Sequence, residues 1–215
     1  MGVRYWLPLR NTDFIHLKDI SDMRYSDVNL LSAKPKWLIQ TCNDLALDEG
    51  FREFAYPDPY SALGLKYKAR KWNWGFEPGD MLLVKYGEKM EDGRPWTYGY
   101  GFTKGVNPSS RINKYMADRA LEQVVLDHLV HLDKMVPNWK SLPHAVITVM
   151  VNMAYNMGER LYQFQPTYDL IAQGKFKEAA SRLRHTLWFR QVGQRAERLC
   201  RRLETGRIEP ERKVV

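Results

Sequence analysis

The feature that most constrains the fold of this chain is an apolar run near its middle, from Leu142 to Met157. The run is about 16 residues long, short of the roughly 18 apolar residues that a membrane span needs, and it holds His144 and two asparagines. Residues 143–157 are apolar nearly all round, so they predict a helix buried at the centre of a helical lobe. Gly158 is expected to end that helix.

A helical period is also present nearer the N-terminus. Leu38, Cys42 and Leu45 fall at positions i, i+4 and i+7, which predicts a helix over residues 36–49. Gly50 follows directly, and glycine readily adopts the left-handed conformation that closes a helix.

Three further helices are predicted after residue 109. The longest is amphipathic and covers 110–136, with Ser109 or Ser110 as its expected cap. Two shorter helices are predicted over 176–187 and 194–205.

The segment between the first two predicted helices differs in character. Residues 51–106 are rich in glycine, proline and aromatic residues, and they predict strands and loops. The order along the chain is therefore a helix, a small β-rich region and an α-helical lobe. We expect an α+β fold with a cleft between its two parts.

Composition narrows the class of protein. The chain has 215 residues, of which 44% are hydrophobic and 27% charged, so it is a globular protein and not a disordered one. A net charge of +8 suggests an anionic partner, such as nucleic acid, an acidic membrane face or an acidic wall polymer. Two cysteines, Cys42 and Cys200, cannot form a disulfide scaffold, and we expect both to be buried helix residues. Residues 1–40 show no export signal, so we expect a soluble protein made in a cytoplasm.

Glu49 is the first candidate for chemistry. It continues the apolar stripe of its helix, because positions 38, 42, 45 and 49 keep the helical step. A carboxyl at the end of such a stripe is expected to be partly desolvated, which disfavours its charged form, as a general acid near neutral pH requires. The alternative interpretation is a solvent-exposed glutamate at a helix end.

Two more elements follow Glu49 in the β-rich region. Asp58 lies between Pro57 and Pro59, which hold it on a stiff loop outside helical geometry. Thr97-Tyr98-Gly99-Tyr100-Gly101 alternates like a strand, with one face nearly bare except for the Thr97 hydroxyl. Glycine in a strand often marks the close approach of a ligand, although each element alone is equally typical of an ordinary turn or hairpin.

Together these elements carry a resemblance. Glu49-Gly50, then Tyr56 and Asp58, then Thr97-x-Gly-x-Gly101 resemble the Glu–Asp–Thr signature of the phage-type lysozymes, glycoside hydrolase family 24, which includes the T-even phage lysozyme and related endolysins. Downstream, Val151-Asn152-Met153-Ala154-Tyr155-Asn156-Met157-Gly158 is similar to the family's central-helix motif. Arg195-Ala196-x-Arg198 is similar to its C-terminal helices.

The resemblance implies a muramidase that hydrolyses the β-1,4 bond between N-acetylmuramic acid and N-acetylglucosamine in peptidoglycan, without a metal or organic cofactor. It assigns Glu49 as the acid, and Asp58 and Thr97 as the residues that position water in an inverting reaction. Arg195 matches a family arginine that pairs with the acid. Such a charge favours the ionised acid, so burial must offset it.

The resemblance and the spacing also indicate substrate contacts. Asn152 and Asn156 share a face of the central helix, where they either bond acetamido groups or form a satisfied buried polar pair. Thr167 is a substrate-side candidate by resemblance alone. Gly101 is expected to allow the substrate to approach the backbone.

The chain departs from the family between Asp58 and Thr97, where residues 59–96 form an insertion. We expect the insertion to be a subdomain within a catalytic domain over 36–206, preceded by an extension over 1–35 and followed by a tail over 207–215.

Within the insertion, the alternation at 65–70 predicts a strand with a basic face, and residues 81–86 are expected to form a small core. The basic residues lie among aromatic ones: Lys66, Lys68, Arg70 and Lys71 among Tyr67, Trp72, Trp74 and Phe76. The face either binds the anionic wall or is only a solvated surface over that core.

Other interpretations remain open. His128 and His131 are three residues apart, but a metal site needs more ligands, so no metal site is predicted. A lytic transglycosylase would cleave the same bond, and a wall-binding module would have lost the chemistry. Residues 150–215 hold 13 Lys and Arg against 7 Asp and Glu, which would suit nucleic acid, but no nucleic-acid motif is present. We therefore expect a monomer that acts on peptidoglycan after release through a holin-type pore, with no nucleic acid and no stable membrane association.

Overall fold

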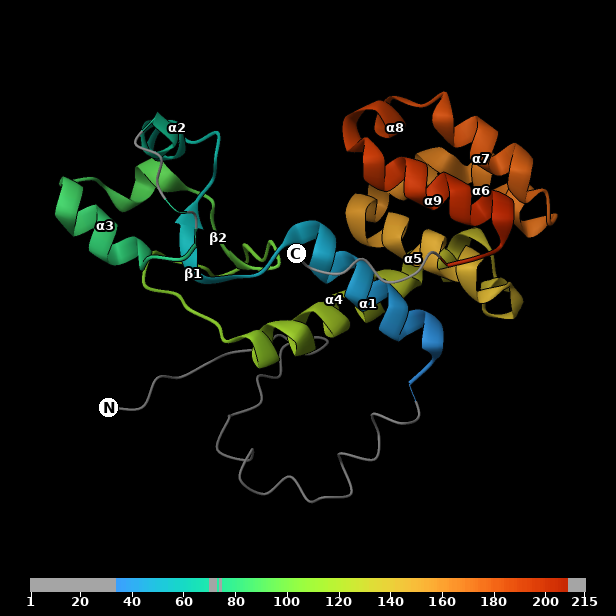
Figure 1. The fold of residues 1–215 in the computed structure, drawn as a ribbon, viewed down its shortest axis with the longest axis horizontal. Coiled ribbons are helices and arrows are strands. Elements are labelled where there is room, and N and C mark those ends of the chain that lie inside the picture. Colours follow the sequence, from blue (N-terminus) through green and yellow to red (C-terminus); the bar gives the residue numbers. More distant parts are fainter. Residues whose placement is uncertain (1–33, 70–72, 74, 209–215) are drawn as a thin grey trace, which may run out of the picture.

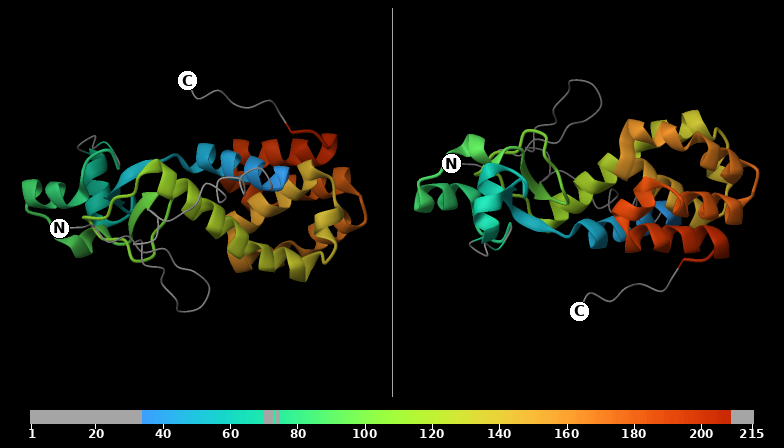
Figure 2. Two further views of the ribbon diagram at one scale, coloured as in Figure 1. Left: turned by 90° about the horizontal axis from the view of Figure 1, so that it is seen from below. Right: turned by 90° about the horizontal axis from the view of Figure 1, so that it is seen from above.

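The computed structural model describes residues 34–69, 73 and 75–208. It has two lobes, joined by α1 (Lys36–Glu49) and α4 (Lys114–Met135), which contact each other and run side by side in opposite directions (Figure 1; Figure 2). One lobe holds a small antiparallel ribbon and short helices, and the other is helical, so the expected α+β, lysozyme-like fold class is confirmed. The extension and the tail lie mostly outside the described residues.

The larger lobe is built around α5 (His144–Met157), which contacts α1, α4 and α9. The ten residues from Ala145 to Ala154 are all buried, so the prediction of a central buried helix is confirmed. Gly158 follows with a φ of 53°. The remaining helices of this lobe are α6 (Gln165–Ala172), α7 (Phe176–Arg184), α8 (Leu187–Val192) and α9 (Gln194–Thr205), with 3-10 turns at Trp139–Ser141 and Gly158–Phe164.

Two details of the helical lobe differ from the sequence prediction. The helix expected over 176–187 ends at Arg184, and Thr186 starts α8 instead, because its hydroxyl accepts the Phe189 N–H at 3.2 Å. The α6 helix was not predicted. No helix among the described residues has the length and apolar character to cross a membrane.

The start of α4 was also predicted wrongly. Its cap is Asn113, whose side chain accepts the Met116 N–H at 2.8 Å, and not Ser109 or Ser110. The serines are unavailable because the chain before α4 is extended and pairs with β1: the Ser110 carbonyl accepts the Ala55 N–H at 2.9 Å. Helical geometry therefore begins only at Lys114.

The smaller lobe is organised by an antiparallel ribbon of β1 (Arg52–Pro57) and β2 (Trp96–Gly99). Between these strands the chain forms α2 (Ala62–Ala69), α3 (Gly79–Tyr86) and a 3-10 turn at Met90–Gly93. Their apolar side chains share a separate core: Ala55, Leu63, Tyr67, Leu82 and Trp96.

The predicted strand over 65–70 is therefore wrong, since its described part is helical. The physical reason lies in Leu65. A strand would place it on the same face as Leu63 and Tyr67, but Leu65 is 55% exposed while the other two are buried in the small core, which is the pattern of a helix. The core expected over 81–86 is also mostly wrong. Leu82 is buried, but Met81 and Val84 are exposed, and Trp96 from β2 fills the centre instead. Arg70, Lys71, Trp72 and Trp74 lie outside the described residues.

Candidate active site

Glu49 is the last residue of α1, at the junction of the two lobes. Gly50 takes a φ of 69°, and the chain then turns into β1. One carboxylate oxygen of Glu49, Oε1, accepts a hydrogen bond from Arg195 Nη1 at 2.8 Å. The side chain keeps 29% of its exposure, so it is less buried than its place on the apolar stripe predicts and solvent can reach it.

Arg195 organises the surroundings of that carboxylate. Its side chain is only 13% exposed, and its Nε atom donates to Asn152 Oδ1 at 3.0 Å. The same Nε lies 3.3 Å from Asp48 Oδ2, which also binds Arg198 at 2.5 Å. Two adjacent carboxylates of α1 are thus held by two arginines of α9, which fixes the orientation of Glu49.

A glycine turn faces the second oxygen of Glu49. A Cβ atom added to Gly101, which has a φ of 94°, would lie 3.9 Å from Glu49 Oε2. The turn is closed by two hydrogen bonds of 3.0 Å between Tyr98 and Phe102. Tyr155 from α5 donates its hydroxyl to the Tyr100 carbonyl at 3.2 Å, which ties the turn to the helical lobe.

Asp58 lies just after β1, and Thr97 lies on β2, the strand that pairs with it. The ladder pairs Tyr56 with Thr97 and Pro57 with Trp96, and Asp58 follows directly. Because side chains alternate along a strand, Tyr56, Asp58 and Thr97 belong to one face of the ribbon. Thr97 is 8% exposed.

Tyr56 links this face to Glu49. Its pKa is raised mainly by burial, with the negative charges of Glu49 and Asp58 adding and Arg52 opposing. Both carboxylates are therefore close enough to act on one phenol. The structure brings the three candidate catalytic residues to the same junction.

The insertion holds Asp58 in place. The Asp58 N–H donates to the carbonyls of Gly93 at 3.0 Å and Pro95 at 3.1 Å, and Asp58 Oδ1 accepts the Tyr60 N–H at 2.7 Å. Ser61 donates its hydroxyl to the Asp58 carbonyl at 2.7 Å. All these partners belong to residues 59–96, so the insertion shapes the position of Asp58.

Gly64 shows how closely the insertion packs on this residue. A Cβ atom there would lie 1.9 Å from the Asp58 carbonyl oxygen, so only glycine fits. The first turn of α2 therefore lies directly against the backbone of the candidate catalytic aspartate.

The predicted substrate contacts have partners within the protein. Asn152 is 1% exposed and its Oδ1 is bound by Arg195, while its Nδ2 has no partner among the described residues. Asn156 Oδ1 accepts the Trp188 indole N–H at 3.1 Å. Thr167 is 1% exposed within α6. The structure brings Asn152 and Gly101 to the surroundings of Glu49 and leaves Thr167 in the interior.

Three residues near Glu49 were not singled out from the sequence. Asp48 and Arg198 complete the ion pairs between α1 and α9. In the sequence, two adjacent acidic residues in the first helix and two arginines three positions apart in the last one could have indicated these pairs. Tyr155 lies beside them, and burial raises its pKa, with the Glu49 charge adding and Arg195 opposing.

The histidine pair has local partners. His128 Nδ1 lies 2.7 Å from the Val124 carbonyl, and His131 Nδ1 lies 3.0 Å from the Tyr162 hydroxyl. Within the described part of the chain, no group of three or more His, Cys, Asp or Glu side chains is arranged to hold a metal ion. Cys42 and Cys200 are both free thiols.

Comparison of the sequence with models of known protein families identifies the family of this chain. The sequence model of the family described as phage lysozyme matches residues 84–205, which is more than half of the chain. The match includes Thr97 and Arg195 but begins after Glu49 and Asp58. A comparison with curated proteins gives no match. The family match, together with the two-lobed fold, shows that this chain belongs to the phage lysozyme family, the endolysin-type enzymes that hydrolyse bacterial peptidoglycan.

Proposed function

We propose that this chain hydrolyses the β-1,4 bond between N-acetylmuramic acid and N-acetylglucosamine with inversion, using Glu49 as the acid and water positioned by Asp58 and Thr97. Membership of the family gives the coarser statement, a lysozyme-type hydrolase of peptidoglycan. The proposal adds the bond, the stereochemistry and the residues.

The observation that carries the proposal is the different environment of the two Glu49 oxygens. Oε1 is occupied by Arg195, whereas Oε2 faces the open side of the Gly101 turn. A proton on Oε2 can reach a glycosidic oxygen that lies against this turn, because glycine leaves the backbone uncovered there. Glu49 thus has one oxygen for orientation and one for proton transfer.

Activation of the attacking water is assigned to Asp58 and Thr97, on one face of the β1–β2 ribbon. Asp58 Oδ1 is held by the Tyr60 N–H, and Oδ2 has no hydrogen bond to a described residue, so it is free to accept one from water. The Thr97 hydroxyl belongs to the same face and supplies a second contact. Inverting glycosidases need room for a water molecule between the sugar and the second carboxylate. Attack from the ribbon side would therefore oppose protonation from the helix side.

The first test is Glu49→Gln, which cannot donate the proton. We expect wall lysis to fall by about 10²- to 10⁴-fold, the usual contribution of general acid catalysis. Glu197→Gln is the matched control, because Glu197 also pairs with an arginine, at 3.0 Å from Arg184, but its partner belongs to α7 and not to the surroundings of Glu49. Lysis by Glu49→Gln at near the control rate would exclude Glu49 as the acid.

The second test examines the products. Hydrolysis in ¹⁸O-labelled water should place the label at the new reducing end, and proton NMR should show the α-anomer first. A 1,6-anhydro product without label would identify a lytic transglycosylase. An initial β-anomer would mean retention and would remove Asp58 as the residue that positions water.

A further inference from the structure

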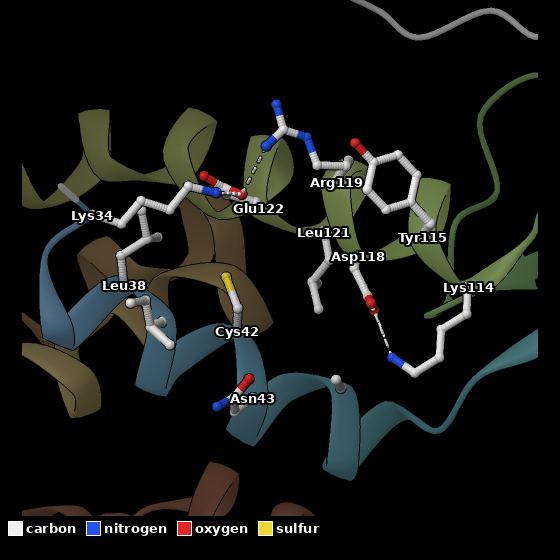
Figure 3. Close-up of a pocket in the computed structure, with 12 residues that line it drawn as sticks. Lys34, Leu38, Cys42, Asn43, Lys114, Tyr115, Asp118, Arg119, Leu121 and Glu122 are labelled. Carbon is white, nitrogen blue, oxygen red and sulfur yellow. Dashed lines mark hydrogen bonds and ion pairs between the residues drawn. The ribbon is translucent and has the colours of Figure 1, made fainter. Parts of the chain in front are cut away.

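A groove lies between α1 and α4, lined by none of the three candidate catalytic residues (Figure 3). Its volume is about 380 Å³. Leu38 and Cys42 from α1 and Leu121 from α4 supply apolar surface, and the Cys42 sulfur points from α1 towards α4.

The walls of the groove are incompletely covered. Ile39 on α1 and Tyr115 on α4 keep 44% and 63% of their exposure, although both are large and apolar. Exposed apolar side chains that line the same groove are typical of a site that another segment covers.

Charges surround the apolar surface. Lys34 pairs with Glu122 and Lys114 lies 3.0 Å from Asp118, while Arg119 approaches Glu122 only to 4.0 Å. The three basic groups therefore exceed the two acidic ones, and the rim favours an acidic occupant.

The chain itself leads to this groove. Lys34, the first described residue, lines it, and 33 residues precede it. From Leu38 to Ala46 the groove follows α1 for about 12 Å, which roughly four extended residues would span. The sequence just before the described residues includes Asp27-Val28-Asn29-Leu30-Leu31, three of them apolar and one acidic, and this stretch can follow α1 if the chain turns back before Lys34.

We propose that residues 27–31 dock in the groove between α1 and α4. Val28, Leu30 and Leu31 cover its apolar surface, and Asp27 lies towards the basic groups Lys114 and Arg119. The docked segment then braces the back of the helix that ends in Glu49. This inference stands apart from the proposed chemistry, since it concerns a different surface.

The thiol of Cys42 tests the docking in the full chain. Cys42 lines the groove, whereas Cys200 is fully buried in the helical lobe and reports unfolding. Burial above all raises the pKa of Cys42 to about 12, with the Glu122 charge adding, so its reaction with N-ethylmaleimide is slow enough to follow by peptide mass spectrometry.

We expect Leu30→Asp with Leu31→Asp to speed modification of Cys42 by roughly tenfold, because the charged residues leave the groove. The matched control, Leu7→Asp with Leu9→Asp, should leave the rate unchanged. Equal rates in the wild type and both variants would overturn the docking. So would protection of Cys42 that disappears on dilution, since a second copy would then be the occupant.

The Leu30→Asp, Leu31→Asp variant could unfold, in which case Cys200 would react as well. A cross-linking experiment then tests the docking independently. In the otherwise native chain, Leu30→Cys should form an intramolecular disulfide with Cys42 under mild oxidation, because bridged residues need Cα atoms within about 7 Å. Leu9→Cys should not. Failure of Leu30→Cys to cross-link, or equal cross-linking by Leu9→Cys, would overturn the proposal.

Discussion

The two lobes bury their apolar side chains on very different scales. The helical lobe and its junction share a cluster of thirty buried residues, whereas the insertion and the ribbon share one of five. The family match covers nearly all of the first and only the end of the second. Yet the small lobe carries Asp58 and Thr97, while the large one carries the arginine that holds Glu49. If Asp58 and Thr97 position the water as proposed, the reaction depends on a core of only five buried residues, in which the loss of one side chain removes a large share of the packing.

The largest expected effect comes from two buried tryptophans, one in each core. Trp96 donates its indole N–H to the Met90 carbonyl at 2.9 Å, and Trp139 donates to Asp133 at 2.8 Å. Replacing either with alanine should cost about 3–5 kcal/mol. We expect Trp96→Ala to disorder the small lobe and abolish lysis while most of the helical circular dichroism persists. Trp139→Ala should instead lower the melting temperature of the helical signal. Normal lysis by Trp96→Ala would show that the five-residue core does not hold the site.

The next effect concerns a buried ion pair of the large lobe. Arg202 is 1% exposed and donates to Asp44 at 2.6 Å and to the Thr148 hydroxyl at 3.0 Å. Arg202→Met should destabilise the lobe by about 3 kcal/mol, because it leaves a buried carboxylate without its partner. Adding Asp44→Leu should recover much of that loss in urea unfolding. A double variant as unstable as the sum of the single ones would mean that the pair is not coupled.

A smaller effect is expected where the lobes join. Asn113→Ala removes the cap of α4 and should cost about 1 kcal/mol, seen as a drop of a few degrees in melting temperature. Ser109→Ala is the control, since Ser109 is exposed and is not the cap of α4. If both variants lose the same stability, the cap observed at Asn113 has no energetic weight.

The smallest expected effect is a change in KM when exposed lysines on one lobe or the other are neutralised. Lys66 and Lys68 are exposed on α2, and Lys175 and Lys177 are exposed at the start of α7. If the insertion contacts the anionic wall, Lys66→Gln with Lys68→Gln should raise the KM for wall polymer by about two- to threefold at low salt, and by less near 300 mM. The Lys175→Gln, Lys177→Gln pair should change KM less. Equal changes in both pairs would mean that only net charge matters, and a lower kcat on a short soluble substrate would show that the insertion shapes the catalytic site.

Sequence reasoning was reliable where one period of apolar residues decided the structure. The helices at 36–49 and 143–157 were predicted within one residue of their observed ends, because each buries one clear face or its whole surface. It failed in the insertion, where α2 and α3 have eight residues each, too few for a helical period to stand out. The cap of α4 was missed because strand pairing by residues 110–112 delays the helix.

For the site, sequence supplied the chemical types but not their partners. Glu49, Asp58 and Thr97 were chosen from a pattern, and their meeting at the junction of the lobes depends on tertiary structure. The bonds of Asp58 with Tyr60 and Ser61 are those of a local turn, but its bonds to the carbonyls of Gly93 and Pro95 were not visible in any local motif. Arg195 forms ion pairs with both Glu49 and Asp48, and these pairs likewise exist only because the fold places α1 and α9 side by side.

The pairing of α1 with α9 has a consequence for the order in which this protein is made. Glu49 meets its arginine 146 positions later in the chain, and Asp44 meets Arg202 158 positions later. A ribosome adds about 5–20 residues per second, so the first helix emerges many seconds before the last one exists. Throughout that time Glu49 and Asp44 lack these arginine partners. If Glu49 is the acid, as proposed, we expect a chain that ends before Arg195 to be inactive, and hydrolytic activity to begin only when synthesis of the chain is nearly complete.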